Sequence, residues 1–265
     1  MMFKMRLALV SHFFACVLAL TAEPLIVAHR GASRDAPENT LPAFQLAWEQ
    51  GADAIEGDFF LTKDNRIVCI HDKSTERLAG RKLIVKDSTL AQLQELDVGI
   101  KKGEKFKGTR IPTIAEVFAT IPEGKKIFIE IKCGKEIIPP LLAAIKASGL
   151  KDEQVTMICF NADVVRIFKA EAPRHKVYWL TKFKRNKKGE WSPSLETVLQ
   201  TLTSTKADGL DCHHGIPAHA AKLILKEGFE WHVWTVNDLK VAKRLKELGV
   251  HSITTDVPGH LKKAF

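Results

Sequence analysis

Two isoleucine-containing segments carry acidic side chains that would face the same way. Glu56 and Asp58 are two residues apart in an expected strand, so both carboxylates lie on one face of it. Glu130 and Lys132 repeat this spacing in a later strand. Three inward carboxylates suggest an oxygen-rich site for a hard divalent cation, Mg²⁺ or Ca²⁺. The same acids could instead pair with Arg30 and Lys132 in a polar network without metal.

Two histidines accompany these acids. His29 and His71 each follow a short apolar run. An imidazole with an unperturbed pKa near about 6.5 can exchange a proton at neutral pH, and it can also bind a metal ion. One histidine at a strand end is usually structural, but two beside three carboxylates favour a catalytic or metal-binding role. We assign secondary or structural roles to His213, His214 and His232.

The elements that would position these side chains alternate along the chain. Short β-branched runs predict strands at Leu25–Ala28, Ala54–Leu61, Arg66–Ile70, Lys126–Lys132, Gln154–Phe160, Lys176–Leu180, Gly209–Cys212, Glu230–Val236 and His251–Thr255. Apolar residues at helical spacing predict helices at Leu41–Glu49, Thr113–Thr120, Ile137–Ala147, Ala162–Glu171, Leu195–Leu202, Ala218–Lys226 and Leu239–Leu248. This alternation is typical of parallel βαβ units with helices outside the sheet.

The strand count is one more than a closed (β/α)8 barrel needs. Residues 54–61 and 66–70 are joined by a connection too short for a parallel crossover, so they must form a hairpin. Residues 73–110 contain several glycines and no clear barrel strand, and we expect an insertion there. An open doubly wound sheet is the alternative, but no GxGxxG motif follows the first strand. We therefore predict an α/β fold, a TIM barrel formed by one domain over residues 23–265, with its active site at the carboxyl ends of the strands.

Seven motifs occur in order along the chain. They are Ala28-His29-Arg30-Gly31-Ala32, Pro37-Glu38-Asn39-Thr40, Gly51-Ala52-Asp53-Ala54-Ile55-Glu56-Gly57-Asp58, Val68-Cys69-Ile70-His71-Asp72, Glu130-Ile131-Lys132, Val233-Trp234-Thr235-Val236-Asn237 and Thr255-Asp256-Val257-Pro258. Together they resemble the signature of the glycerophosphodiester phosphodiesterase family. The resemblance spans about residues 25–260.

This resemblance implies a TIM barrel with an inserted subdomain after the second strand. It also implies roles for single residues that match functional positions of the family. These are the metal carboxylates Glu56, Asp58 and Glu130, the catalytic histidines His29 and His71, the phosphate-binding Arg30, the active-site Lys132 and the substrate-side aromatic Trp234.

The expected reaction is metal-dependent hydrolysis of a glycerophosphodiester to glycerol 3-phosphate and an alcohol. Either water or the neighbouring glycerol hydroxyl of the substrate could attack the phosphorus, and either histidine could be the base. A phospholipase D-like hydrolysis of lysophospholipids is the enzymatic alternative. A surface binding protein without activity is a third hypothesis, which the presence of all five acid and histidine positions disfavours.

The N-terminal segment has the pattern of a secretory signal peptide. Two basic residues precede an almost wholly apolar run from Leu7 to Leu20, and small residues follow up to Ala22. This run is too short for a comfortable membrane span, which needs about 20 apolar residues. We expect residues 1–22 to be removed and the protein to be exported, to the periplasm or the medium.

Charge and cysteines add weaker constraints on partners. The formal net charge is +9, and it is +7 without Lys4 and Arg6 of the expected signal peptide. The basic run at residues 182–188 is expected to be a solvated loop, and no nucleic-acid-binding motif accompanies it. We expect a small phosphodiester as the partner, no nucleic acid, and membrane contact at most at the surface. The four later cysteines form no CxxC pair and are expected to be free thiols.

Overall fold

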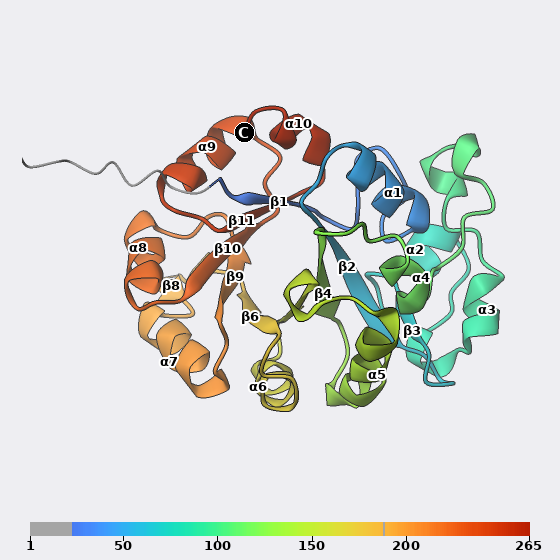
Figure 1. Cartoon of the computed structure of the whole chain (residues 1–265), viewed down its shortest axis with the longest axis horizontal. Coiled ribbons are helices and arrows are strands. Elements are labelled where there is room, and N and C mark those ends of the chain that lie inside the picture. Colours follow the sequence, from blue (N-terminus) through green and yellow to red (C-terminus); the bar gives the residue numbers. More distant parts are fainter. Residues whose placement is uncertain (1–22, 188) are drawn as a thin grey trace, which may run out of the picture.

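Parallel strands close into an eight-stranded barrel in the part of the chain that the computed structural model describes, residues 23–187 and 189–265 (Figure 1). The barrel strands are β1 (Leu25–Ala28), β2 (Ala54–Leu61), β4 (Lys126–Ile131), β5 (Val155–Cys159), β6 (Lys176–Thr181), β9 (Gly209–His213), β10 (Glu230–Trp234) and β11 (Ser252–Thr255). Each is parallel to its neighbours, and β11 pairs with β1 to close the ring. The predicted TIM barrel is confirmed. The expected signal peptide lies outside the described residues.

Helices cover the outside of this barrel (Figure 1). They are α1 (Leu41–Glu49), α4 (Ile114–Phe118), α5 (Ile138–Ser148), α6 (Ala162–Glu171), α7 (Leu195–Thr205), α8 (Ala218–Lys226), α9 (Leu239–Glu247) and α10 (Pro258–Lys262), with short 3-10 turns η4 (Lys135–Ile137) and η5 (Asp152–Gln154) before α5 and β5. Side chains cap several of their first turns. Ser194 accepts a hydrogen bond from the Thr197 amide at the start of α7, and Asp238 accepts one from the Val241 amide in α9.

The alternation of side chains along β2 separates the core from the site. Ile55 and Phe59 are fully buried in the apolar layer between the strands and the helices. Glu56 and Asp58 point the other way, into the barrel. Gly57 faces outward, where an added Cβ would lie 3.1 Å from Cys69 Sγ. A larger residue would therefore require the side chains of Cys69, Phe59 and Phe44 to shift.

The segment after β2 forms the predicted hairpin and insertion. β3 (Ile67–Cys69) is antiparallel to β2. Beyond it the chain forms the short elements α2 (Glu76–Ala79), η1 (Val85–Asp87), α3 (Leu90–Gln94), η2 (Ile100–Lys102) and η3 (Glu104–Phe106) before it returns to the barrel. These elements have a small apolar core of their own, in which Val85 and Leu93 pack against Phe60 and Ile70.

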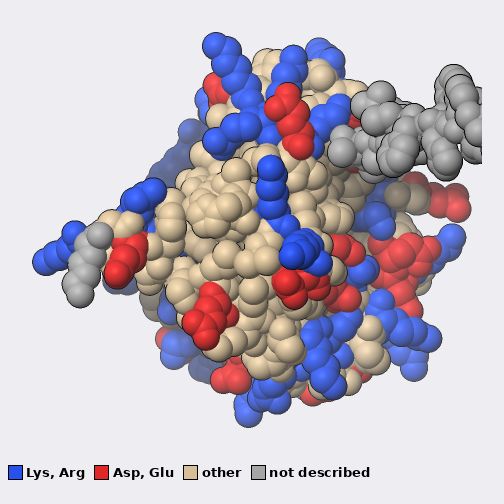
Figure 2. Space-filling model, turned by 90° about the vertical axis from the view of Figure 1, so that its left-hand side faces the viewer, with Lys and Arg blue, Asp and Glu red and all other residues tan. Residues whose placement is uncertain are grey.

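The described basic side chains of residues 182–187 are exposed, as expected of a solvated segment, but two of these residues form a strand rather than a loop. The structure shows a short hairpin of β7 (Lys184–Arg185) and β8 (Trp191–Ser192), in which the Arg185 guanidinium lies over the Trp191 ring. Figure 2 shows that basic side chains on this side of the molecule are spread among acidic ones. No helix of the described residues is long and apolar enough to cross a membrane.

Candidate active site

A cavity of about 180 Å³ opens at the carboxyl ends of the barrel strands. Every residue that the sequence analysis assigned to the site lines this cavity, except Asp58. The lining members of that set are His29, Arg30, Glu56, His71, Glu130, Lys132 and Trp234. Asp58 is 1% exposed and contacts two of them, Arg30 and Lys132.

Three carboxylates from two adjacent strands converge at this cavity, and two of them line it. Asp58 and Glu130 are partners in the β2–β4 ladder, and Glu56 precedes Asp58 on the same face. One oxygen from each of the three lies within 4.8 Å of the others. Glu56 Oε2 accepts a hydrogen bond of 2.9 Å from the Arg30 amide, while Glu56 Oε1 is buried without a partner among the described residues. An unpaired carboxylate oxygen in an all-oxygen donor set fits a hard divalent cation.

The electrostatics of this cluster favour a bound cation. Burial, followed by the charges of Asp58 and Glu130, raises the pKa of Glu56 well above its ordinary value. Burial, followed by the charge of Asp58, raises the pKa of Glu130 to about 7. Burial also acts to raise the pKa of Asp58, but Lys132 and Arg30 outweigh it and lower that pKa. A bound cation would favour the charged form of all three acids.

Arg30 and Lys132 lie on either side of Asp58. Arg30 Nε is 3.2 Å from Asp58 Oδ2, and Lys132 Nζ is 3.3 Å from Asp58 Oδ1. Lys132 also donates a hydrogen bond of 2.7 Å to Glu130. The ion pairs weighed as an alternative to a metal site are therefore present, but they leave Glu56 Oε1 unpaired.

The turn that carries Arg30 requires a particular backbone. Arg30 has φ of 56° and Gly31 has φ of 79°. A Cβ added at Gly31 would lie 2.6 Å from the backbone of Ala43, so only glycine fits beside α1. The left-handed conformation at Arg30 is uncommon for a residue with a Cβ, and such residues are enriched at functional sites.

Both histidines are held by carboxylates. His29 Nδ1 lies 2.6 Å from Asp256 Oδ1, and His71 Nδ1 lies 2.7 Å from Asp72 Oδ1. Burial would raise the pKa of Asp256, but hydrogen bonds from His29 and Asn237 lower it to about 2, so this residue is a carboxylate at neutral pH. These bonds fix each ring and leave its Nε2 as the nitrogen that can exchange a proton.

The far side of the cavity has an aromatic wall with two unpaired polar groups. Trp234 packs edge-on against Phe160, with ring centroids 5.8 Å apart. Trp234 Nε1 and Asp211 Oδ1 are both buried and have no hydrogen-bond partner within the described chain. Burial, followed by the charge of Glu130, raises the pKa of Asp211 well above its ordinary value.

Asp211 was not predicted as a site residue from the sequence. It lies between Leu210 and Cys212, two apolar positions that face outward from β9, and this pattern was its signal. Roles were also not predicted for the residues that hold the histidines and Arg30. Asp256, Asp72 and Glu38, which pairs with Arg30, belong to quoted motifs. Arg77, which pairs with Glu38 and Asp72, lies in the insertion, where spacing alone carries no information about its contacts.

Comparisons with known proteins agree with this arrangement. The profile of the Glycerophosphoryl diester phosphodiesterase family matches residues 29–260. A glycerophosphodiester phosphodiesterase of Caldanaerobacter subterraneus subsp. tengcongensis is 38% identical over 241 residues, which cover 88% of this chain and 94% of that protein. Because the match covers nearly the whole of both chains, it supports the same class of reaction, phosphodiester hydrolysis, for this chain.

Solved structures give the same result. A phosphodiesterase of Oleispira antarctica, in complex with the product sn-glycerol-3-phosphate, superposes with a TM-score of 0.82 at 26% identity, over 91% of this chain and 96% of that one. A glycerophosphodiester phosphodiesterase of Thermotoga maritima superposes with a TM-score of 0.74 at 25% identity, over 92% and 99%. With its barrel, its acidic cluster and these relatives, this chain belongs to the glycerophosphoryl diester phosphodiesterase family.

Proposed function

We propose that this phosphodiesterase hydrolyses glycerophosphodiesters to glycerol 3-phosphate and an alcohol, with a divalent cation, Mg²⁺ or Ca²⁺, and two histidines. The supporting observation is that a carboxylate cluster with an unpaired oxygen shares one small cavity with two carboxylate-bound histidines. A metal-free ion-pair network would leave Glu56 Oε1 buried without a partner among the described residues.

Phosphate binding is assigned to the cations of the cavity. Glu56, Asp58 and Glu130 would hold the divalent cation, which would neutralise charge that develops on the phosphoryl oxygens. Arg30 and Lys132 line the same cavity and bind the non-bridging oxygens of the phosphate. Their ion pairs with Asp58 hold both side chains in place before substrate arrives.

Proton transfer is assigned to His29 and His71. One ring removes a proton from the attacking oxygen through Nε2, and the other gives a proton to the alcohol oxygen as its bond to phosphorus breaks. Asp256 and Asp72 hold the rings and stabilise the imidazolium that forms on each.

The glycerol half of the substrate is placed against the aromatic wall. Asp211 and Trp234 supply the unpaired polar groups there, and a glycerol hydroxyl can both donate and accept hydrogen bonds. The product bound in the Oleispira antarctica relative, sn-glycerol-3-phosphate, has the size and groups that this end of the cavity would accommodate.

The test is an assay of the purified chain after removal of metal with a chelator. Glycerophosphocholine is supplied, and glycerol 3-phosphate release is followed as Mg²⁺ or Ca²⁺ is restored. We expect release only with metal, and we expect H29A and H71A each to lower kcat by about 10²- to 10⁴-fold, the usual contribution of a general acid or base.

Two outcomes would contradict the proposal. Full activity in the chelated enzyme would exclude the metal, and near wild-type turnover in folded H29A and H71A would exclude the histidine pair. Lysophosphatidylcholine is assayed in parallel. A clear preference for it over glycerophosphocholine would replace the soluble diester with a lysophospholipid as substrate.

A further inference from the structure

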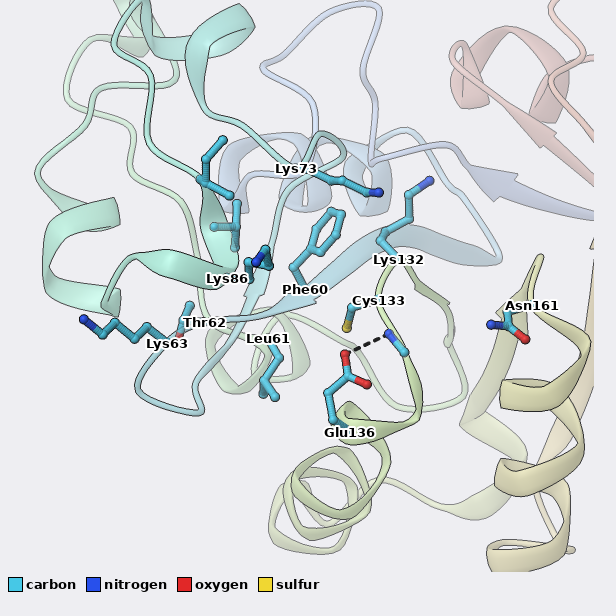
Figure 3. A pocket seen from close by; sticks show the side chains of 13 residues that line it. Phe60, Leu61, Thr62, Lys63, Lys73, Lys86, Lys132, Cys133, Glu136 and Asn161 are labelled. Carbon is cyan, nitrogen blue, oxygen red and sulfur yellow. Dashed lines mark hydrogen bonds between the residues drawn. The ribbon is translucent and has the colours of Figure 1, made fainter.

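A second and larger pocket, of about 590 Å³, opens beside the active-site cavity (Figure 3). The end of β2, the η1 region of the insertion and the loop between β4 and η4 form its walls. Phe60 and Val85 belong to its apolar part, which is continuous with the core of the insertion. The insertion therefore builds this pocket together with the barrel.

The pocket has a positive lining. Lys63, Lys73, Lys86 and Lys132 line it, and Glu136 is the one acid among its described lining residues. Within the described residues Lys63 and Lys73 form no ion pair, and Lys86 has only an exposed contact of 3.4 Å with Asp87. Glu136 accepts a hydrogen bond from the Gly134 amide, as Figure 3 shows. Amines without counterions suit an anionic ligand.

Lys132 joins this pocket to the active site. It lines both cavities, and in Figure 3 Lys73 and Lys132 extend to the same side of the pocket, whereas Lys63 reaches to the opposite side. The active-site cavity is only about 180 Å³, while pockets that enclose a drug-sized ligand usually measure about 300 to 1,000 Å³. It has room for the glycerol phosphate half of a diester, so the alcohol half must lie in an adjoining space.

Another pocket among the described residues also adjoins the site. This pocket of about 310 Å³ shares His29 and Arg30 with the active-site cavity and is lined on its outer side by Arg34 and Lys102. Its lining also contains the acids Glu38 and Asp256, so its charges are nearly balanced. An anionic alcohol is therefore better matched by the lysine-lined pocket.

We propose that the lysine-lined pocket binds the leaving alcohol of the diester and selects alcohols that carry a further anionic group, such as a phosphate. This assignment rests on the proposed hydrolysis of glycerophosphodiesters. The bond that breaks joins phosphorus to the alcohol oxygen, water supplies the oxygen that replaces it, and the alcohol takes up a proton. The phosphorylated alcohol is then released from the lysine-lined pocket, and glycerol 3-phosphate from the active-site cavity.

The test compares two substrates that differ by one phosphate, glycerophosphoinositol and glycerophosphoinositol 4-phosphate, at saturating metal. We expect wild-type kcat/KM to be about tenfold higher for the phosphorylated diester, and this preference to fall as salt concentration rises. The double variant K73Q/K86Q should lose the preference while it retains wild-type kcat/KM for glycerophosphoinositol, which also shows that it is folded. R34Q removes one charge from the other adjoining pocket and should keep the preference.

Each failure has its own signature. If the wild type hydrolyses both diesters with equal kcat/KM, or if R34Q rather than K73Q/K86Q loses the preference, the pocket assignment is wrong. A higher kcat/KM for lysophosphatidylcholine than for the phosphorylated diester would mean that the apolar part of the pocket binds an acyl chain. This result would also overturn the pocket assignment. Hydrolysis of glycerophosphocholine but of neither inositol diester would also overturn the pocket assignment. If glycerophosphocholine is not hydrolysed either, with any metal, the proposed function fails instead.

Discussion

The polar residues of the site differ in whether other protein groups already supply their hydrogen-bond partners. Asp58 is held by Asn39, whose amide nitrogen donates a hydrogen bond of 2.8 Å, and by two cations. Asp211 Oδ1 has no hydrogen-bond partner among the described residues, although burying a carboxyl group without hydrogen bonds is unfavourable. Its position in the wall of the cavity makes it a candidate to bind a hydroxyl group of the substrate.

The substitution D211A is expected to raise KM for glycerophosphocholine by about tenfold, the usual effect of one lost hydrogen bond to substrate. D211N keeps a donor and an acceptor at the same place and should stay within about threefold of wild type. Bis(p-nitrophenyl) phosphate, which has no glycerol hydroxyls, serves as the control substrate. An equal loss by D211A on both substrates would show that Asp211 acts on the cluster rather than on glycerol.

At the scale of elements, the insertion contacts the residues that hold the proposed site. Arg77 in α2 donates hydrogen bonds of 2.9 and 2.7 Å to Glu38, which holds Arg30, and one of 2.5 Å to Asp72, which holds His71. A single side chain of the insertion therefore supports the residues that hold both Arg30 and His71, to which we assign phosphate binding and proton transfer.

Replacement of Arg77 by methionine is expected to lower kcat by about 10- to 100-fold, because small displacements of positioned groups are costly. Stability should change little, since Arg77 is half exposed. R81M is the matched control, because Arg81 is in the same insertion and its contact with Glu95 is exposed. Equal kcat values for R77M and R81M would mean that the Glu38 and Asp72 contacts do not position the catalytic residues.

The elements of the barrel were predictable because their patterns are local. The bounds of β1, β2, α1, α6 and α8 agree with the sequence predictions, since apolar alternation and helical spacing need no knowledge of distant residues. The short helices of the insertion were not predicted. They depend on packing against Phe60 and Ile70, which no periodicity within residues 73–110 encodes.

For the candidate site, most of the lining residues were predictable from the sequence, but their partners were not. Motifs drew attention to the residues that line the cavity, because those side chains lie within apolar strands or directly after them. Their partners were not assigned. His29 and Asp256 are 227 positions apart, and Arg77 and Glu38 are 39 apart, so only the closed barrel brings them together.

For the molecule as a whole, the barrel interior has polar groups at both ends and an apolar layer between them. The carboxyl ends of the strands hold the acidic site, while Val27, Phe128 and Ile158 fill the space below it. The opposite end holds a polar network in which His232 stacks on Tyr178, with ring centroids 3.9 Å apart, and bonds to Ser252. The site therefore rests on a packed floor and a second set of buried polar groups.

His232 makes the stability of the whole fold depend on pH. Burial, only partly opposed by Glu230, lowers the pKa of His232 to about 4. The unfolded chain takes up a proton at this residue near about 6.5, and the folded protein does so only near pH 4. The contribution of His232 to the free energy of unfolding is thus complete above pH 6.5. It is lost as pH falls from 6.5 to 4, and its size is on the order of 3 kcal/mol. The charged or titratable groups around the ring are Glu230, Lys176, Tyr178 and His251.

Urea unfolding of wild type and H232Q between pH 7.5 and pH 4 tests this prediction. Buried acids whose pKa is raised, such as Glu130, contribute a pH dependence of the opposite sign, but they are common to both proteins. The difference in unfolding free energy between wild type and variant should therefore decrease as pH falls from 6.5 to 4, because only the wild type loses the contribution of a neutral buried imidazole. A difference that stays constant over this range would mean that His232 is charged in the folded barrel, with Glu230, 3.4 Å from its Nε2, as the counterion.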